Sequence, residues 1–188
     1  MTSEGLADLE ANDRKVVSSI CGTPSPPQVC FGEGALAPRV VFILGLPHGL
    51  HPLDAEGKEK FTQLRTAMQL EANEVYITSV IKTLTLASRA PHPADVRRDR
   101  PWLERQLIRL APQAIVTFGP KVGAMLTSNE IQDCGAGQIS SVELEGVHGP
   151  IAVHMTHEFS VLTRQGRDDA KAREMWCHLQ AVMEAIAR

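Results

Sequence analysis

The sequence predicts an α/β fold in three layers, with a central four-stranded, mostly parallel sheet between two layers of helices. Short runs of apolar, β-branched residues are typical of strands that are buried on both faces. These runs alternate with segments whose apolar residues recur at helical spacing, which is the order of βαβ units with right-handed crossovers. A chain of 188 residues with 43% hydrophobic and 22% charged residues suits one globular core. We therefore expect a single domain over residues 1–188.

The first part of the chain predicts an amphipathic helix within residues 1–22, followed by a connection over residues 23–38. The connection is rich in proline and glycine, which interrupt regular structure. The apolar residues of the helix recur at intervals that place them on one face. They are Leu6, Leu9, Val16 or Val17, and Ile20.

Four core strands and four further helices are expected after this connection. The strands are the apolar runs 40–44, 75–81, 114–118 and 151–155, and an edge hairpin around residues 142–146 precedes the last of them. The helices follow from apolar residues at intervals of three and four. They cover residues 57–70, 102–110, 120–126 and 172–186.

The topology predicts where a ligand would bind. In parallel α/β sheets, ligands bind on the loops that leave the carboxyl ends of the strands. Four segments of this chain meet that description, namely residues 45–52, 79–93, 118–122 and 156–164.

Composition excludes several classes of protein. The longest apolar run, residues 40–46, is too short to span a bilayer, and the first residues lack the pattern of a signal peptide, so we expect a cytoplasmic protein without membrane contact. The four cysteines form no C-x-x-C pair, and His148, His154 and His157 match no zinc signature. We expect no metal and no cofactor.

The edge segments and their neighbours carry the motifs of a known family. Residues 29–34 read Val-Cys-Phe-Gly-Glu-Gly, residues 75–82 read Val-Tyr-Ile-Thr-Ser-Val-Ile-Lys, and residues 156–164 read Thr-His-Glu-Phe-Ser-Val-Leu-Thr-Arg. With residues 39–45 and the run 112–119, they resemble the uracil-DNA glycosylase superfamily, closest to its family 4 (iron–sulfur) branch. The order and spacing match from about Ser18 to the end of the last helix.

The resemblance implies a protein that binds DNA, single-stranded or with a flipped base, at the carboxyl edge of the sheet. A base must leave the stack before its glycosidic carbon can be reached. In the family, the loop after the first strand supplies an acid, the end of the second strand supplies an Asn that reads the base, and the last loop supplies a His that holds the departing base.

This chain departs from the family pattern at several of these points. The family motif Gly-Glu-Ala-Pro-Gly is Gly-Leu-Pro-His-Gly at residues 45–49, so Leu46 occupies the acidic position. Ser79 stands at the position of the Asn and offers one hydroxyl instead of an amide. His157 is retained, and Glu158 follows it where the family has Pro.

The family's iron–sulfur cluster requires four cysteine ligands. Only Cys21 falls at a matching place, and Ser18, Thr83 and a residue near Asp99 take the other three. Because three of the four cysteine ligands are missing, we predict no cluster in this chain.

The candidate catalytic residues are His157, His48 and His51, because an imidazole that titrates near neutrality can act as a general base. The alternative for each is a solvated or structural histidine. In the family, a Phe stacks on the flipped base. In this chain Phe61 and His51 are the two candidates for that role. The expected substrate-binding residues lie on three of the four edge segments, 45–52, 79–93 and 156–164. They are Gly45, Leu46, Pro47, Gly49, Ser79, Lys82 and Arg164.

The expected DNA-binding residues come from an arginine-rich segment and from a helix start. Residues 89–109 hold six arginines against three acids, a strip that can contact phosphates, although a solvated helix face gives the same pattern. The sequence Gly-Pro-Lys at residues 119–121 opens a helix whose free N–H groups can bind a phosphate. The DNA-binding candidates are Arg89, Arg97, Arg98 and Lys121.

Two functions remain open from the sequence. In the first, the chain is a DNA glycosylase of base-excision repair with divergent or reduced activity. In the second, it is a catalytically inactive DNA-repair or replication module on the same fold. Both require DNA as a partner, both admit repair or replication proteins as further partners, and we expect a monomer.

Overall fold

The centre of the fold is a set of four parallel strands, in agreement with the fold class predicted from the sequence. The computed structural model describes residue 11 and residues 29–82, 93–127 and 135–187. Every residue of the first three central strands is buried, because apolar runs without polar alternation bury both faces. The four strands are β2 (Val40–Leu44), β3 (Val75–Ser79), β4 (Ala114–Phe118) and β6 (Ile151–Thr156).

The sheet has six strands rather than four, in the order β1-β3-β2-β4-β6-β5. The additional strands are β1 (Glu33–Gly34) and β5 (Ile139–Val142), and each pairs antiparallel at one edge. A two-residue strand has no periodicity to detect, and β5 is largely exposed, so neither carries the apolar run of a core strand. The predicted hairpin at 142–146 marks the end of β5.

The parallel register brings the ends of the central strands to one edge. Leu44 pairs with Ser79, and Phe118 pairs with Thr156. The loops that follow these four residues therefore start side by side, as the sequence predicted for the ligand-binding edge.

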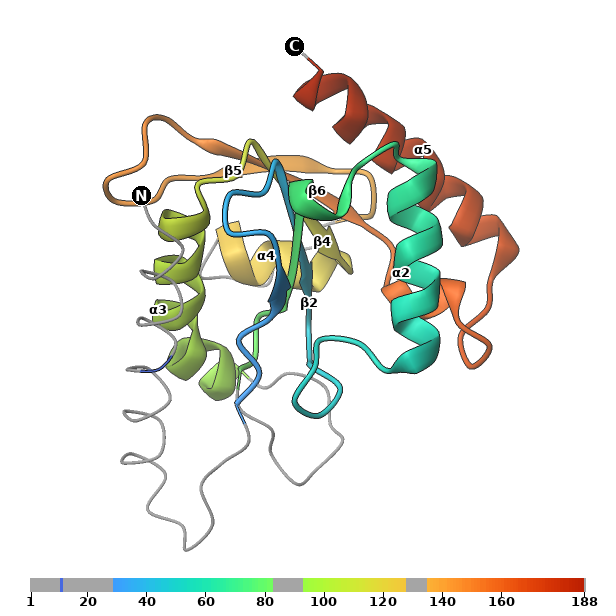
Figure 1. The fold of residues 1–188 in the computed structure, drawn as a ribbon, viewed down its shortest axis with the longest axis horizontal. Helices are drawn as coiled ribbons and strands as arrows, with labels where there is room; N and C mark the ends of the chain where they lie inside the picture. Colours follow the sequence, from blue (N-terminus) through green and yellow to red (C-terminus); the bar gives the residue numbers. More distant parts are fainter. Residues whose placement is uncertain (1–10, 12–28, 83–92, 128–134, 188) are drawn as a thin grey trace, which may run out of the picture.

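Helices cover both faces of the sheet (Figure 1). The helices α3 (Pro93–Leu110) and α4 (Pro120–Thr127) pack on one face through a cluster that contains Leu107, Ile115 and Val122. The helices α2 (Ala55–Ala67) and α5 (Asp169–Ile186) cover the other face. No described helix is long and apolar enough to cross a membrane. The expected N-terminal helix lies outside the described residues, apart from residue 11.

A row of four aromatic rings joins the sheet to α2 and to the loop after β6. Phe61 of α2 meets Phe42 edge to face at 5.0 Å, Phe42 stacks on Phe118 at 5.8 Å, and Phe118 meets Phe159 at 4.9 Å. Phe159 begins the short 3-10 helix η2 (Phe159–Leu162). Such pairs add about 0.5–1.5 kcal/mol each beyond the burial of their area. The row fixes where the loop after β6 leaves the sheet.

Candidate functional site

The loop after β2 is a tight turn that presents His48 and His51 to solvent. Two backbone hydrogen bonds close it, from His48 N–H to the His51 carbonyl at 2.8 Å and from His51 N–H to the His48 carbonyl at 3.3 Å. The His51 ring lies 3.4 Å from a carboxylate oxygen of Glu33, which also pairs with Lys58. Gly49 adopts a φ of +68°, which suits glycine at the tip of such a turn.

The remaining residues of this loop offer no acid. Leu46 is 41% exposed at the position where the family has a carboxylate, and Pro47 is buried. The carbonyl of Gly45 accepts a hydrogen bond from the N–H of Ile81 at 3.2 Å. This bond joins the loop after β2 to the loop after β3.

Ser79 is placed at the end of β3, as predicted, but its hydroxyl is already engaged. The side chain is fully buried, and its Oγ donates to the Ile81 carbonyl at 2.7 Å. Only the lone pairs of Oγ are left to accept a hydrogen bond from a ligand.

Lys82 lies inside the protein rather than on the surface of the edge. Its side chain is fully buried, and its ammonium donates to the hydroxyl of Thr78. Its backbone N–H donates to Asp99 at 2.7 Å, and its carbonyl accepts from the N–H of Cys30 at 2.8 Å. In this arrangement the ammonium faces the protein interior.

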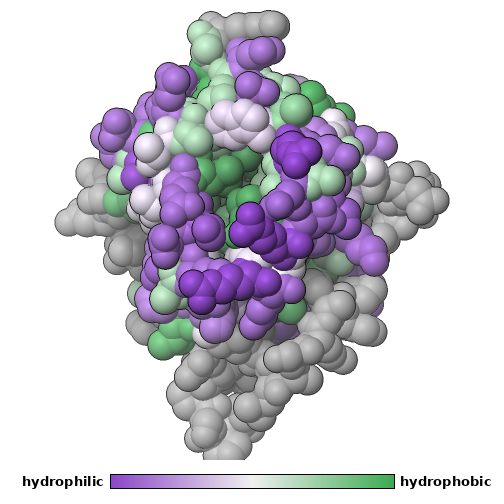
Figure 2. Space-filling view, turned by 90° about the vertical axis from the view of Figure 1, so that its right-hand side faces the viewer, coloured by the Kyte–Doolittle hydropathy of each residue, from purple (hydrophilic) through white to green (hydrophobic). Residues whose placement is uncertain are grey.

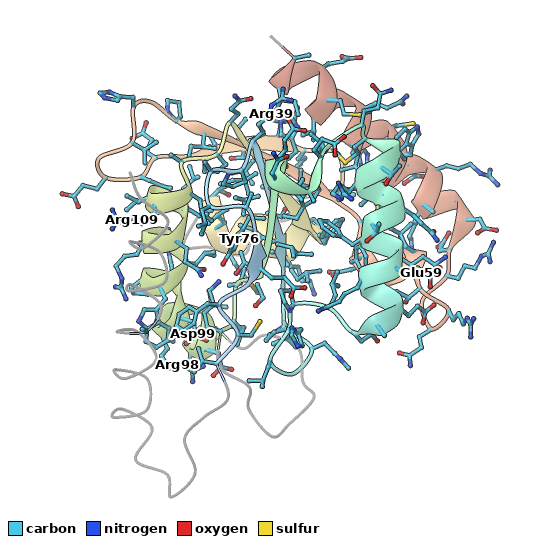
Figure 3. All side chains as sticks on the ribbon, in the orientation of Figure 1. Arg39, Glu59, Tyr76, Arg98, Asp99 and Arg109 are labelled. Carbon is cyan, nitrogen blue, oxygen red and sulfur yellow. The ribbon has the colours of Figure 1, made fainter. Side chains whose placement is uncertain are left out.

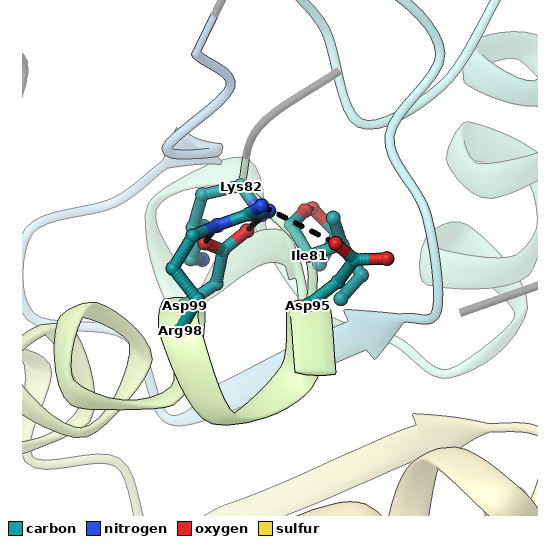
Figure 4. Close-up of polar contacts among 6 residues, drawn as sticks. Ile81, Lys82, Asp95, Arg98 and Asp99 are labelled. Carbon is teal, nitrogen blue, oxygen red and sulfur yellow. Dashed lines mark hydrogen bonds and ion pairs between the residues drawn. The ribbon is translucent and has the colours of Figure 1, made fainter. Parts of the chain in front are cut away.

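Arg98 belongs to the same buried cluster, which fastens α3 to the end of β3 (Figure 4). Its guanidinium lies 2.7 Å from Asp99 and 3.2 Å from Asp95. Because Asp99 has no exposed side-chain area, the pair is shielded from water on one side. Arg98 thus has a structural role as well as a place near the edge.

The arginines of α3 are spread along the whole helix. Arg98 and Asp99 lie at the end that meets β3, whereas Arg109 projects from the opposite end (Figure 3). Arg97 is exposed next to Arg98, and Lys121 is exposed in the first turn of α4. Arg89 lies outside the described residues. Of the DNA-binding candidates that the structure describes, Arg97 and Lys121 are the more accessible.

His157 is held by a carboxylate that the sequence analysis did not single out. Its Nε2 lies 2.7 Å from Oε2 of Glu174 on α5, and its side chain is 16% exposed. Its ring is 5.7 Å from that of His178, whose Nδ1 lies 3.1 Å from the Thr156 hydroxyl. Glu174 and His178 are four residues apart on one helix, so they share a face. This spacing is the signal in the sequence that could have pointed to the pair. It does not show that this face of the helix meets the end of β6, where His157 lies.

Burial lowers the pKa of His178, the second histidine of this pair. Loss of water lowers the pKa of His178, and the nearby charge of His157 lowers it further, while Glu174 acts in the opposite direction. His178 therefore favours its neutral form more than an exposed histidine does.

Glu158, the next residue, is the N-cap of η2, and its carboxyl lies against Gly119 at the end of β4. A Cβ on Gly119 would overlap Oε1 of Glu158. The side chain reaches solvent, yet the surrounding protein atoms desolvate the carboxyl and raise its pKa, and the charge of Lys121 lowers it in part.

A cleft of about 490 Å³ lies beside this edge, between α2 and the segment that joins η2 to α5. Figure 2 shows it as a hollow with a hydrophobic floor and a hydrophilic rim. Its apolar lining residues include Leu64, Val161 and Ala172, and its charged lining residues include Glu56 and Arg164. Arg164 is 94% exposed, and its backbone N–H donates to Glu56 at 2.9 Å.

The described residues contain no group of three or more His, Cys, Asp or Glu side chains that could hold a metal ion. Of the four cysteines, Cys30 is buried and Cys177 is exposed, and Cys21 and Cys134 lie outside the described residues. Asp99 lies near the position of one of the family's cluster ligands, and its carboxylate accepts hydrogen bonds from the Lys82 N–H and from Arg98. The expectation that the protein holds no cluster stays a prediction.

The protein is thus an α/β domain whose sheet is covered by helices on both faces. Histidines and a carboxyl group lie on the loops at the carboxyl ends of its parallel strands. The family model described as the uracil DNA glycosylase superfamily matches residues 31–180, and the chain belongs to this superfamily. It is also similar to the type-4 uracil-DNA glycosylase of Sulfurisphaera tokodaii, with 29% identity over 94 residues. That match spans 47% of this chain and 43% of the relative.

Proposed function

We propose that this protein is a DNA glycosylase of base-excision repair that hydrolyses an N-glycosidic bond with divergent or reduced activity. The observation that carries the proposal is His157, on the loop after β6, with its Nε2 held 2.7 Å from the Glu174 carboxylate. The superfamily and the type-4 relative support DNA as the substrate.

The pair suits the stabilisation of a departing base. A carboxylate only accepts hydrogen bonds, so the Nε2 of His157 carries a proton when it binds Glu174. The other ring nitrogen, Nδ1, is a donor when the ring is protonated. An imidazolium in this position can donate to the base as negative charge develops on it during cleavage.

The edge also offers cations for the phosphate backbone. Arg97 and Lys121 are exposed, and Arg164 is almost fully so. Phosphate contacts of this kind set affinity and its dependence on salt, but they carry little sequence information. They suit an enzyme that selects its substrate by the flipped base.

A second function, a catalytically inactive DNA-binding module, is favoured by two other features. Leu46 cannot orient water or stabilise a cationic sugar, and the hydroxyl of Ser79 is already bonded to Ile81. Both features remove groups that a uracil-specific enzyme would use.

Single-turnover release of base separates the two functions. The substrates are single-stranded and mismatched oligonucleotides that contain uracil, hypoxanthine or xanthine, with protein in excess. The glycosylase proposal predicts release that His157→Ala reduces about 100-fold or more while DNA affinity is retained. Binding without release from any of these substrates would favour the inactive module.

Salt titration of DNA affinity tests the interface. Arg97→Ala combined with Lys121→Ala should weaken binding and lower the slope of log affinity against log salt by about two. The matched control is Arg109→Ala, an exposed arginine at the other end of α3. Equal slopes for both variants would remove these two residues from the interface.

A further inference from the structure

The described residues of the four edge loops contain one carboxyl group. These residues are 45–52, 79–82, 119–121 and 156–164, and the acid among them is Glu158. Hydrolysis of a glycosidic bond needs a group that orients water and offsets the positive charge of the sugar, and a carboxylate serves both purposes.

The other carboxylates near this edge are already engaged. Asp54 caps α2 by accepting from the N–H of Gly57, and Glu33 pairs with Lys58. Glu56 accepts the backbone N–H of Arg164. The carboxyl of Glu158, in contrast, accepts no hydrogen bond from any described side chain or backbone N–H, so both of its oxygens are left for water or a ligand.

The Glu158 carboxyl lies in space that is free because residue 119 is a glycine. Gly119 adopts a φ of +103° between β4 and α4, and only a glycine leaves the space that Oε1 of Glu158 fills. The Gly119 N–H donates to the Thr156 carbonyl at 3.0 Å, which ties the loop after β4 to the loop that carries Glu158. The carboxyl is therefore held against Gly119 where β4 and β6 end, and it belongs to the residue that follows His157 in the sequence.

We propose that Glu158 is the catalytic carboxylate of this protein and takes the role that Leu46 cannot fill. The inference rests on the proposed glycosylase function. In the step, the glycosidic C–N bond breaks and its electron pair leaves with the base, which accepts a hydrogen bond from His157. The oxygen of a water molecule then bonds to the sugar carbon. Glu158 accepts the proton that this water loses and later releases it to solvent.

The electrostatics of the site agree with this role. Desolvation raises the pKa of Glu158, which makes the ionised carboxylate a stronger base. The positive charge of Lys121 on α4 lowers this pKa in part and so favours the ionised form. His157 is the titratable neighbour on the same loop. Activity should require ionised Glu158, so the rate should rise with pH through the raised pKa of this carboxyl.

The test is single-turnover base release by Glu158→Gln, a change that keeps the size of the side chain. The matched control is Glu145→Gln, an exposed acid in the turn between β5 and β6, at the other end of the strands. We expect Glu158→Gln to lose about 100-fold or more in rate, with DNA affinity within about threefold of the unchanged protein, and Glu145→Gln to lose nothing.

The pH profile provides a second readout that a structural role would not produce. In the unchanged protein the rate should rise with pH through the raised pKa of Glu158, and this limb should vanish in Glu158→Gln. Lys121→Gln should move the limb to higher pH, because the cation no longer favours the carboxylate.

The outcomes separate this inference from the function on which it rests. Release by the unchanged protein and by Glu158→Gln at equal rates would overturn the role of Glu158 and leave the glycosylase proposal standing. No release by the unchanged protein from any substrate would overturn both. Loss of rate together with loss of the ascending limb would establish Glu158 as the catalytic carboxylate.

Discussion

The buried carboxylate of Asp99 should be one of the groups on which the stability of this domain depends most. It accepts the backbone N–H of Lys82 and the guanidinium of Arg98, both at 2.7 Å, and its side chain has no exposed area. Asp99→Ala would leave the Lys82 N–H without its acceptor and would deprive Arg98 of its closest partner.

The expected cost follows from these contacts. A buried N–H that loses its partner costs about 1–3 kcal/mol. Breaking a buried ion pair costs about 3–5 kcal/mol, but Arg98 is partly exposed and keeps Asp95, so we take less than that range for the pair. We expect about 2–4 kcal/mol for Asp99→Ala, and about 1–2 kcal/mol for Asp99→Asn, which retains an oxygen acceptor.

Urea unfolding followed by far-ultraviolet circular dichroism measures this cost. With a slope of about 2 kcal/mol per molar urea, Asp99→Ala should lower the midpoint by about 1–2 M. The control is Glu104→Gln, which removes a more exposed pair with Arg100 on the same helix and should cost less than about 0.5 kcal/mol. Equal midpoints for Asp99→Ala and Glu104→Gln would refute the structural role of the cluster.

Three further changes test other parts of the structure. Phe118→Ala removes the middle of the aromatic row and should cost about 3–5 kcal/mol in urea unfolding, whereas a loss under 1 kcal/mol would show that the row collapses to fill the cavity. Gly119→Ala should cost about 1–3 kcal/mol of stability because Gly119 has a positive φ. It should also slow base release as Glu158→Gln does, because the added Cβ displaces the Glu158 carboxyl. Unchanged release would contradict the contact between Gly119 and Glu158. Burial lowers the pKa of His154 below 6.5, so the unfolded chain binds the proton more readily and stability is lost as pH falls below about 6.5. His154→Leu should flatten the dependence of unfolding free energy on pH below about 6.5, and parallel profiles for the two proteins would contradict this origin.

The central strands could be predicted from sequence because burial on both faces leaves a local pattern. The run 114–118 matches β4 at both ends, and the run 75–81 exceeds β3 only by the residues that begin the next loop. The last helix was found through its apolar stripe, which packs Met175, Leu179 and Val182 against the sheet.

The first half of α3 was not predicted, because polar contacts replace the apolar ones that periodicity detects. The apolar stripe indicated a helix from residue 102, but α3 begins at Pro93. In its first turns Asp99 and Arg98 meet the end of β3 through hydrogen bonds and an ion pair. Charged residues at these positions look like a solvated face until the neighbouring strand is known.

The candidate site was only partly accessible from sequence for a related reason. His157 could be placed on its loop by resemblance, but its partner Glu174 depends on how α5 crosses β6. From sequence, Glu158 is only a departure from the family pattern. Its place against Gly119 depends on the register of β4 and β6, which no local pattern encodes.

The bond between the Arg164 N–H and Glu56 spans 108 residues of sequence and joins the loop after β6 to the first turn of α2. The loop after β2 is closed by its own pair of backbone bonds. Much of the conformational entropy of these segments is therefore lost when the chain folds, before any nucleic acid arrives. Association should then require little further ordering of the protein at these two loops, so its entropic cost falls mainly on the DNA that must bend or unstack.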